Sequence, residues 1–409
     1  MQTSGVRTRR WVPVVAALAL LIGACGSGGD SAGGSAEVGV SADTIRLAAS
    51  QTLSGPGAAS CAPSTDAAKL WFDKVNTDGG IAGRKIDFEV LDDGYDPARA
   101  LANVRTFEKD KFAMVGACGS ATAAAIYKTL SQKGIPFLFP TNGVSEVVKP
   151  ASPGIFQVLP LYEDQTASMV RYGFEKSGKG SIFVVVNPLG AYQSAIDSAK
   201  KQATDLGGTF TNSAVATLGT TDYTPIALQI KQAKPDYVVM SMGGSDSAKF
   251  VNALVDQNAV PAKAILGTTA SVAGSFLSSY NPGAASKIFF GSAIQLPAGK
   301  DADCTKLLAG TPAVDDPIAL TGCASARAIT TAITETKDLT RANLMKTIEG
   351  WQKKEVAPGI LAELSFSSTD HIGISSLFIV QPQGRAFRTI ATCPYGEDVQ
   401  SQGACTAAA

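Results

Sequence analysis

The chain has 409 residues, enough for about two domains of ordinary size. Its 35 lysine and arginine residues balance 35 aspartate and glutamate residues, which excludes the strongly basic character typical of nucleic-acid-binding proteins. Hydrophobic residues make up 45% of the chain and charged residues only 17%, which excludes an intrinsically disordered protein and predicts a large buried core.

The N-terminus predicts export. Residues 1–10 contain three arginines and no acidic residue, and residues 11–22 form an apolar run. This order is typical of a secretory signal peptide, whereas a membrane-spanning helix would need about 20 apolar residues. The next residues, "IGAC" (22–25), resemble the lipobox of bacterial lipoproteins. The resemblance implies a signal peptide over 1–24, a lipidated Cys25 and a protein held by acyl chains at the outer face of the cell membrane, in the periplasm or cell-wall space.

Two further features complete the N-terminal prediction. "TRRW" (8–11) loosely resembles a twin-arginine signal, so the general and the twin-arginine export routes both stay open. Residues 25–43 are rich in glycine, serine and alanine and are predicted to form a lipidated, flexible tether. No later apolar stretch is long enough to cross a membrane, so contact with the membrane is expected only through the lipid.

Seven cysteines minus Cys25 leave an even number, which in an exported protein predicts disulfides. Their spacings fit no zinc site, and the possible pairings are numerous. Sequence proximity favours two short-range pairs and leaves a third. The two favoured pairs are Cys304 with Cys323 and Cys393 with Cys405, and the pair left over is Cys61 with Cys118.

After the tether, strand-like and helical segments alternate, which predicts parallel sheets covered by helices on both faces. The first run has strands at 44–50, 85–91, 112–116 and 135–140, with helices at 64–78, 97–110 and 121–133. The second run has strands at 180–187, 214–218, 236–242, 263–269 and 287–293, with helices at 192–206, 223–233 and 246–258. A helix-rich region follows at 302–350, and strands at 361–367, 375–381 and 386–392 have short connections that indicate antiparallel pairing.

Several segments resemble one protein family. They are "GGIAGRKI" and "DDGYDP" (within 75–126), a strand ending in "VGxxxS", "GIPFLFPTNGVSEV" (134–147) and "LSFSSTDHIGISSLFIVQ" (364–381). These segments resemble the substrate-binding proteins of branched-chain amino acid ABC transporters, the leucine/isoleucine/valine-binding type, over about residues 44–392. The resemblance implies an α/β type I periplasmic binding fold, in which two Rossmann-like lobes are joined by a three-strand hinge.

By this resemblance the chain crosses between lobes near residues 161, 295 and 357. One lobe would contain residues 44–160 and 296–356, and the other residues 161–295 and 357–392, with 393–409 as a C-terminal tail. Ligand would bind between the lobes.

The stretch "VGACGSAT" (115–122) predicts an anion-facing site from its residues alone. A strand ends at Gly116, and a helix then begins with unpaired N–H groups that suit a carboxylate. Ser120 and Thr122 add hydroxyl groups next to Ala121. The alternative is that Ser120 is only the N-cap of the helix. The resemblance implies that the serine of "VGxxxS" contacts a ligand carboxylate.

The other candidate ligand contacts come from loops that follow strands. "PTNGVS" offers Thr141, Asn142 and Gly143, where the family often has a hydroxyl at the third of these positions. From the second lobe the resemblance implies a tyrosine, but Ala191 occupies the aligned position and Tyr192 is next to it. The remaining candidates are Ser245 and Thr269.

The family's amino-acid binders carry an acidic residue near the position of Thr269, and "LGTTASVAG" (266–274) has none. An ammonium buried without a carboxylate is costly. Either the ligand lacks an amino group or Asp246 takes the role of the missing acid. We therefore expect a small polar or carboxylate-bearing molecule, with branched-chain amino acids still possible.

The segment "SGPGAASCAP" (54–63) follows the first strand and should also border the cleft. Cys61 and Cys118 would then be neighbours, and a disulfide between them would hold two binding loops together.

An enzyme is not expected. The only histidine, His371, is expected to be an exposed turn residue, so no serine or cysteine has a plausible base. "DDGYDP" is interpreted as a turn and helix cap, and no nucleotide-binding glycine loop, cofactor or metal is predicted. The expected partners are a small ligand and the permease and ATPase subunits of an importer, with the protein itself a monomer. The alternative is a sensor that presents the same clamp to a membrane receptor.

Overall fold

The computed structural model describes residues 37–55, 57–116, 118–188, 192–300, 302–395 and 404–408. The predicted signal peptide, Cys25 and the tether up to residue 36 therefore lie outside the described residues. Among the helices that the structure describes, none is both long and apolar enough to cross a membrane.

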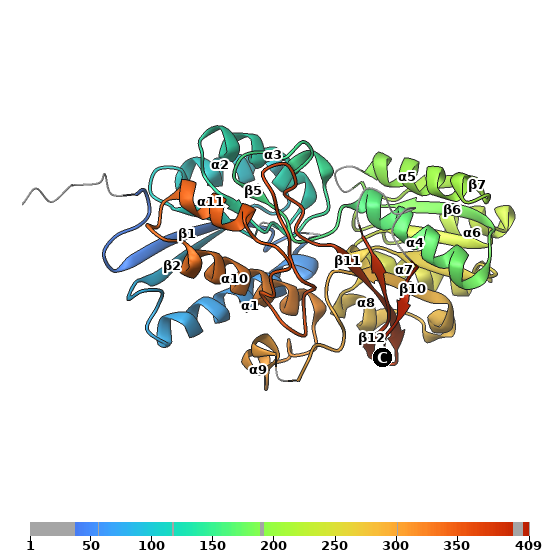
Figure 1. Ribbon diagram of the computed structural model, residues 1–409. Coiled ribbons are helices and arrows are strands. Elements are labelled where there is room, and N and C mark those ends of the chain that lie inside the picture. The colour runs from blue at the N-terminus through green and yellow to red at the C-terminus, as the bar shows by residue number, and fades with distance from the viewer. Residues whose placement is uncertain are drawn as a thin grey trace, which may run out of the picture. The chain divides into compact units, whose positions relative to one another are not determined.

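The first sheet has five parallel strands in the order β2-β1-β3-β4-β5. Helices cover both faces of this sheet (Figure 1). Leu47 of β1 packs with residues of α1 and α10, while Ala48 packs with residues of α2 and α3. The strands are β1 (Thr44–Gln51), β2 (Lys85–Asp92), β3 (Ala113–Val115), β4 (Phe137–Leu138) and β5 (Ile155–Phe156). The helices on this side are α1 (Ala58–Thr77), α2 (Pro97–Phe107), α3 (Ser120–Gln132), α9 (Asp303–Leu308), α10 (Pro317–Glu335) and α11 (Arg341–Glu349).

The second sheet has eight strands in the order β13-β12-β11-β10-β9-β8-β6-β7. β7, β6, β8, β9 and β10 are parallel, and the last three strands are antiparallel, as the short connections predict. The strands are β6 (Ser181–Val186), β7 (Thr209–Val215), β8 (Tyr237–Ser241), β9 (Ala264–Gly267), β10 (Ile288–Ser292), β11 (Ser376–Gln383), β12 (Ala386–Pro394) and β13 (Thr406–Ala407).

Helices cover both faces of this second sheet. Val184 of β6 packs with residues of α4 and α5, and the next residue, Val185, belongs to the cluster that includes α6, α7 and α8. The helices are α4 (Tyr162–Ser177), α5 (Tyr192–Asp205), α6 (Thr224–Ala233), α7 (Gly244–Asp256) and α8 (Gly274–Ser279). The predicted parallel α/β organisation in two runs is therefore confirmed.

The connections between the two sheets lie side by side. The Gln157 N–H donates to the His371 carbonyl at 2.9 Å, and the Gly373 N–H donates to the Gln157 carbonyl at 2.8 Å. The Gln295 N–H donates to the Ile360 carbonyl at 2.8 Å. The first connection thus pairs with the chain just before β11, and the second pairs with the chain at Ile360.

The prediction of a strand at 361–367 and of a crossing near 357 is wrong. Leu361 and Leu364 form only isolated bridges, and Phe366 packs against Phe139 and Phe156 beside the first sheet, with ring centroids 6.1 and 5.6 Å apart. This aromatic contact keeps the chain on the first side, so the third crossing lies near residue 375, just before β11.

His371 lies in the same hairpin and is buried, not exposed as expected. Only 2% of its surface is accessible, its ring centroid is 4.4 Å from that of Phe156, and its Nδ1 lies 3.1 Å from the Ser152 carbonyl oxygen. The hairpin folds back onto the first sheet, and this long-range contact has no signal in the local sequence.

Three other boundaries differ from prediction. α1 begins at Ala58 and not at 64 as predicted. Pro63, which was expected to precede the helix, lies inside its first turns without ending it. β7 begins at Thr209 and not at 214, since it is a largely exposed edge strand without an apolar run. The expected tail 393–409 instead includes the end of β12 and the edge strand β13, and the disulfide between Cys393 and Cys405 joins them.

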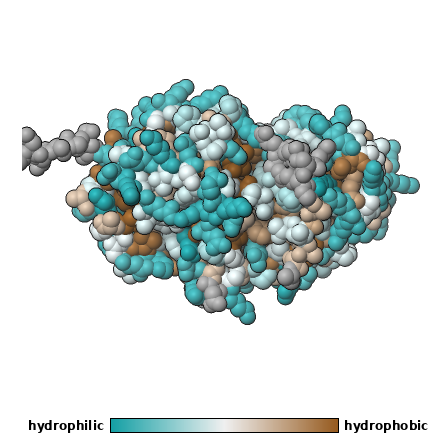
Figure 2. All heavy atoms as spheres, in the orientation of Figure 1, coloured by the Kyte–Doolittle hydropathy of each residue, from teal (hydrophilic) through white to brown (hydrophobic). Residues whose placement is uncertain are grey.

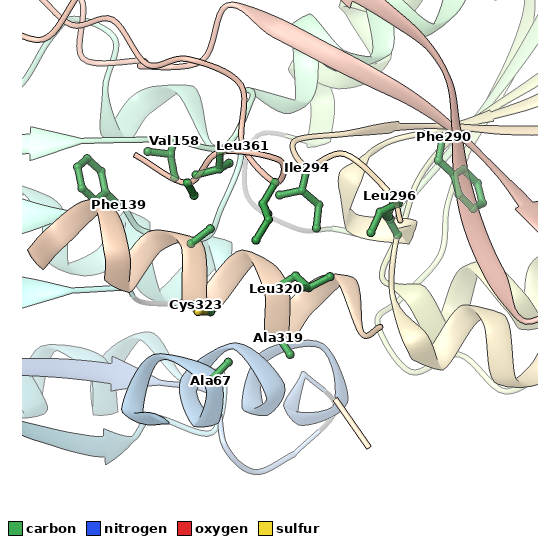
Figure 3. Close-up of a cluster of buried hydrophobic side chains, with 14 of the residues drawn as sticks. Ala67, Phe139, Val158, Phe290, Ile294, Leu296, Ala319, Leu320, Cys323 and Leu361 are labelled. Carbon is green, nitrogen blue, oxygen red and sulfur yellow. The ribbon is translucent and has the colours of Figure 1, made fainter. Parts of the chain in front are cut away.

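One hydrophobic cluster runs from the helices of the first sheet to the strands of the second. Figure 3 shows Leu320 of α10 near Ile294 and Leu296, with Phe139 at one end and Phe290 at the other. On the face shown in Figure 2, hydrophilic residues predominate and hydrophobic areas are small. Most hydrophobic side chains of the described residues thus lie in the interior.

Candidate ligand-binding site

One cavity lies at the carboxyl ends of strands from both sheets. Open parallel sheets bind ligands at this edge, where neighbouring strands connect in opposite directions. The order of the first sheet places this point between β1 and β3, and that of the second between β6 and β8. The cavity volume is about 110 Å³. Its lining residues are Gly57, Ser60, Cys61, Ser64, Tyr95, Cys118, Gly119, Ser120, Thr141, Gly143, Leu159, Pro160, Tyr162, Gln165, Leu218, Gly243, Ser245, Thr269, Ala270, Val272, Ser292, Ala293, Ile294, Pro317, Ile318 and Thr321.

The N-terminus of α3 forms part of the first wall, which we define as the lining residues from the loops after β1, β2, β3 and β4. Gly119 has a φ of 128°, which favours glycine, and the helix begins at Ser120 without a side-chain cap. The alternative that Ser120 is the N-cap is therefore wrong. Its Oγ instead lies 3.3 Å from the hydroxyl oxygen of Tyr162, at the start of α4.

Ser120 and Tyr162 are 3% and 9% exposed and share this one hydrogen bond. A hydroxyl pair has two hydrogens, and one hydrogen bond uses only one of them. One hydroxyl hydrogen therefore remains available at the cavity.

Tyr95, in the loop after β2, is a second phenol at the cavity and belongs to the first wall. Its buried hydroxyl has no hydrogen-bond partner among the described residues. Burial raises its pKa well above the usual value, and the nearby N–H groups of Ala121 and Ser120 act in the opposite direction. Burial likewise raises the pKa of Tyr162, although its bond with Ser120 opposes this. Both phenols therefore stay protonated at neutral pH and can donate hydrogen bonds.

The loop after β4 explains the glycine at position 143. A Cβ there would lie 2.9 Å from both the Pro160 carbonyl oxygen and the ring of Tyr162. A hydroxyl-bearing residue would thus displace Tyr162 from the cavity wall. Thr141, two residues earlier, lines the cavity with a buried Oγ1 that lacks a partner among the described residues.

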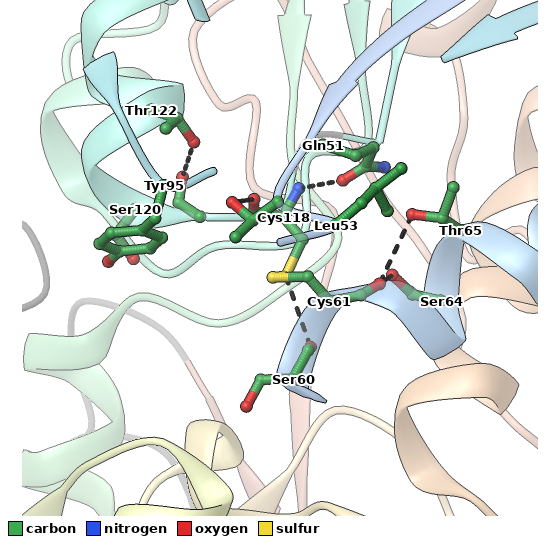
Figure 4. The surroundings of a disulfide bond; sticks show 12 residues. Gln51, Leu53, Ser60, Cys61, Ser64, Thr65, Tyr95, Cys118, Ser120 and Thr122 are labelled. Carbon is green, nitrogen blue, oxygen red and sulfur yellow. Dashed lines mark hydrogen bonds between the residues drawn. A yellow bond between two sulfur atoms is a disulfide. The ribbon is translucent and has the colours of Figure 1, made fainter. Parts of the chain in front are cut away.

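The disulfide between Cys61 and Cys118 confirms the predicted pairing and lines the cavity (Figure 4). It joins the first turns of α1 to the loop before α3. The Cys118 N–H also donates to Gln51 Oε1 at 2.7 Å, so this loop is held from both sides. The remaining predicted pair, Cys304 with Cys323, is present as well.

The second wall is defined as the lining residues from α4 and from the loops of the second sheet, and its residues Thr269 and Gln165 have polar groups that already have partners. Thr269 Oγ1 donates to the Gly291 carbonyl at 3.1 Å. Gln165 accepts from the Thr269 N–H at 2.7 Å and donates to the Pro160 carbonyl at 2.7 Å. These groups fix the shape of the wall.

Asp246 does not take the role of the missing acid. It is 1% exposed, is not a lining residue, and accepts hydrogen bonds from the Gly219 N–H at 2.8 Å and Asn187 Nδ2 at 3.2 Å. Lys249 lies 3.8 Å away as a further partner. The carboxylate is used to hold two loops of the second sheet together.

The described lining residues include no aspartate, glutamate, lysine, arginine or histidine. Ala117 and the segment 189–191 lie outside the described residues, and they too are uncharged in the sequence. No group of three or more potential ligands in the described chain is arranged to hold a metal ion.

The structure brings five of the nine predicted contact residues to the cavity, namely Ser120, Thr141, Gly143, Ser245 and Thr269. Four others do not line it. Thr122 Oγ1 donates to the Gly119 carbonyl, Asn142 Oδ1 accepts from the Val144 N–H, Tyr192 is 38% exposed, and the fourth is Ala121.

Sequence reasoning missed Tyr95 and Tyr162. "DDGYDP" does form the predicted turn and cap, since Asp96 caps α2, but Tyr95 has a φ of 67° that turns its ring to the cavity. Tyr162 faces the cavity because Gly143 leaves room for its ring. An aromatic residue directly after a strand end, beside a glycine, was the available signal for Tyr95.

Comparisons with known proteins give consistent results. The profile of the periplasmic binding protein family matches residues 44–386. A Leu/Ile/Val-binding protein of Rhizobium johnstonii is 27% identical over 189 residues, which is 46% of this chain and 51% of that protein. A leucine-, isoleucine-, valine-, threonine- and alanine-binding protein of Pseudomonas aeruginosa is 23% identical over 50% of this chain and 55% of its own. The chain thus spans about half the length of these curated relatives, which are named as binding proteins and not as enzymes.

Solved structures match over more of the chain. A fatty acid ABC transporter substrate-binding protein from Thermomonospora curvata has a TM-score of 0.78 at 20% identity, covering 89% of this chain and 96% of that one. A branched-chain amino acid ABC transporter protein from Thermus thermophilus with bound valine has a TM-score of 0.76 at 17% identity, covering 87% and 97%. At this identity the likeness shows the fold, and it confirms the predicted two-lobed α/β architecture.

Proposed function

The chain belongs to the periplasmic binding protein family, and we propose that it captures a small ligand between its two lobes outside the cytoplasm and delivers it to an ABC importer. The observation that carries the proposal is the cavity itself, which is lined by loops at the carboxyl ends of strands from both sheets. A ligand that contacts both walls stabilises the closed arrangement of the lobes, because its contacts to the second wall exist only there.

The ligand we propose is a small molecule with a polar or carboxylate end. Its volume is limited, since a cavity of about 110 Å³ is below the roughly 300–1,000 Å³ of sites for drug-sized ligands. Ser120, Thr141, Gly143, Ser245 and Thr269 are the proposed contact residues from the sequence prediction, joined by Tyr95 and Tyr162. The relatives named above bind branched-chain amino acids or are named for fatty acids, so both chemistries belong in the test.

The hinge of this clamp would be the three connections near residues 157–161, 293–296 and 372–375. The lobes would then contain residues 44–160 with 296–374, and residues 161–295 with 375–395. Changes in the backbone angles of these few residues would rotate the lobes without breaking either sheet.

A thermal-shift screen over amino acids, keto acids, aromatic acids, fatty acids and small amides tests the proposal. A true ligand should raise the midpoint of unfolding by an amount that grows with the logarithm of its concentration over its Kd. Ser120→Ala should weaken binding of that ligand by about tenfold or more, because a hydrogen bond to a charged group contributes about 1.5–3 kcal/mol. Ser131→Ala, on the same helix but away from the cavity, should not. If no compound of any class stabilises the protein, the proposed function is wrong.

Lipid anchoring by Cys25 is proposed on the lipobox resemblance. Cys25→Ser should abolish incorporation of labelled palmitate and move the protein from the membrane fraction to the soluble fraction. Retention of the label in the variant would exclude this anchor. Permease and ATPase genes adjacent to this gene would favour delivery to an importer over the sensor alternative.

A further inference from the structure

We infer that the cavity selects carboxylic acids without an amino group, and that it discriminates against α-amino acids of the same carbon skeleton. This inference rests on the proposed function and narrows its ligand class. It follows from the kinds of hydrogen-bonding group that remain free on the first wall, and from the absence of charge among the described lining residues.

The free groups of the first wall can donate hydrogen bonds. The Tyr95 hydroxyl and Thr141 Oγ1 are buried and have no partner among the described residues. The pair of Ser120 and Tyr162 has one hydroxyl hydrogen to spare. The N–H groups of Ser120 and Ala121 act on the Tyr95 oxygen, so the hydroxyl hydrogen of Tyr95 is the part left for a ligand. A carboxylate has only acceptors and can pair with these hydroxyl hydrogens.

The backbone carbonyls around the same position already accept hydrogen bonds. The Cys118 carbonyl accepts from Thr52 Oγ1 at 3.2 Å, and the Pro160 carbonyl accepts from Gln165 Nε2 at 2.7 Å. The Gly119 carbonyl accepts from Thr122 Oγ1 and from the Ala123 N–H. An ammonium has three donors and no acceptor, so only neutral oxygens, the hydroxyls and the second lone pairs of carbonyls, are left for it, and none of them carries a charge.

The carboxylates of Asp246 and Glu163 already accept hydrogen bonds from other groups of the protein. Asp246 is bonded to the N–H of Gly219 and to Asn187. Glu163, the residue after Tyr162, accepts from Ser145 and from Ser194, and it does not line the cavity. An ammonium in this cavity would therefore lose its hydration without gaining a counter-charge.

Part of the remaining lining is apolar and suits the hydrocarbon part of such an acid. Val272 and Ile294 are each 2% exposed. Leu218, Pro317 and Ile318 line the cavity with them. The ligand class is thus a short aliphatic or aromatic monocarboxylate whose charged end meets α3.

A matched ligand series tests the inference on the unmodified full-length protein. The probes are 4-methylpentanoate, leucine, 4-methyl-2-oxopentanoate and 4-methylpentanamide, which share one carbon skeleton and differ only in their polar groups. Calorimetry should give a Kd for 4-methylpentanoate at least tenfold lower than for leucine, and also lower than for the neutral amide. The oxo acid should bind at least as tightly as 4-methylpentanoate, and therefore more tightly than leucine.

Each other outcome is decisive. Leucine binding as tightly as the acid would overturn the inference and leave the proposed function standing. Tightest binding of the amide would overturn the carboxylate part in the same way. If none of the series binds while another class in the ligand screen does, the inference is wrong and the clamp is confirmed. If nothing binds at all, both are wrong.

Discussion

The two walls of the cavity use polar residues in different ways. On the first wall, Tyr95 and Thr141 have buried hydroxyls without partners among the described residues. On the second wall, Thr269 and Gln165 are bonded to each other and to backbone carbonyls. Free polar groups on one side and satisfied groups on the other indicate that the first wall supplies ligand hydrogen bonds, while the second supplies shape.

The difference between the two walls predicts that the largest loss of stability comes from removing the disulfide of the first wall. Replacing Cys61 and Cys118 together by serine should lower the free energy of unfolding by about 2–5 kcal/mol, because the bond closes a long loop. The sequence separation is 57, against 12 for Cys393 and Cys405. Chemical denaturation measures the loss, and calorimetry should show weaker ligand binding only for the first pair. Equal ligand affinity in both double variants would contradict a role in holding the first wall.

Gly143 connects the two walls through Tyr162. Gly143→Ala should reduce ligand affinity by more than tenfold, because its Cβ would push the Tyr162 ring and the Pro160 carbonyl away. Gly299→Ala is the matched control, since its Cβ would find only ordinary contacts at 3.6 Å and beyond. Calorimetry on both variants checks this, and an unchanged Kd for Gly143→Ala would show that Tyr162 does not contribute to the site.

Asp246 should matter for stability and not for ligand charge. Asp246→Asn should lower the free energy of unfolding by about 1–3 kcal/mol, because the buried N–H of Gly219 loses a charged acceptor. The ratio of the Kd values for an acid and its amino acid should stay constant. A change in that ratio would place Asp246 in the site after all.

Exchanging single hydroxyls should give opposite results on the two walls. Tyr95→Phe removes a hydroxyl without a partner, so affinity should fall by about tenfold while stability stays constant or rises. Thr269→Val removes a bond to the Gly291 carbonyl, so stability should fall by about 1 kcal/mol with little change in affinity. Denaturation measures the stability of both variants, and calorimetry measures their ligand affinity. A loss of affinity in Thr269→Val and not in Tyr95→Phe would contradict the roles given to the two walls.

The smallest effect concerns pH and the loops that support Tyr95. Burial acts to raise the pKa of Asp92, but bonds from Ser54, the Leu53 N–H and the Gly94 N–H, with the charge of Arg99, hold it well below the usual value. A lowered pKa in the folded state gives stability that is present above the ordinary carboxyl pKa and is lost as pH falls below it. The stability difference between the wild type and Asp92→Asn should therefore shrink between about pH 4 and 2. A stability difference that stays constant over this pH range would contradict the prediction.

Much of the fold could be predicted because buried parallel strands are continuous apolar runs. The strands predicted at 44–50 and 85–91 lie within one residue of β1 and β2. Predictions failed where an element is stabilised by distant contacts or lies at an edge. Phe366 holds its hairpin against the first sheet, β7 is largely exposed, and the end of β12 pairs with β13 through a disulfide.

The site shows the same division. Ser120, Thr141 and Ser245 could be placed near the cavity because each follows a predicted strand, and strand ends meet at one edge of a sheet. Tyr95 and Tyr162 could not, because the direction of a ring depends on a single backbone angle and on the space left by a glycine.

The sequence by itself determined the family, the two-run α/β order and the loops that border the cavity, while it only favoured the cysteine pairing that the structure shows. Apolar periodicity and turn residues are local properties, so they can be recognised without coordinates. Only the tertiary structure decided which polar groups remain free. Asp246 is an acid beside the cleft in the sequence, yet Gly219 and Asn187 occupy it in the fold. Whether a hydroxyl or carboxylate can meet a ligand depends on the partners that distant segments bring to it, and that information exists only in three dimensions.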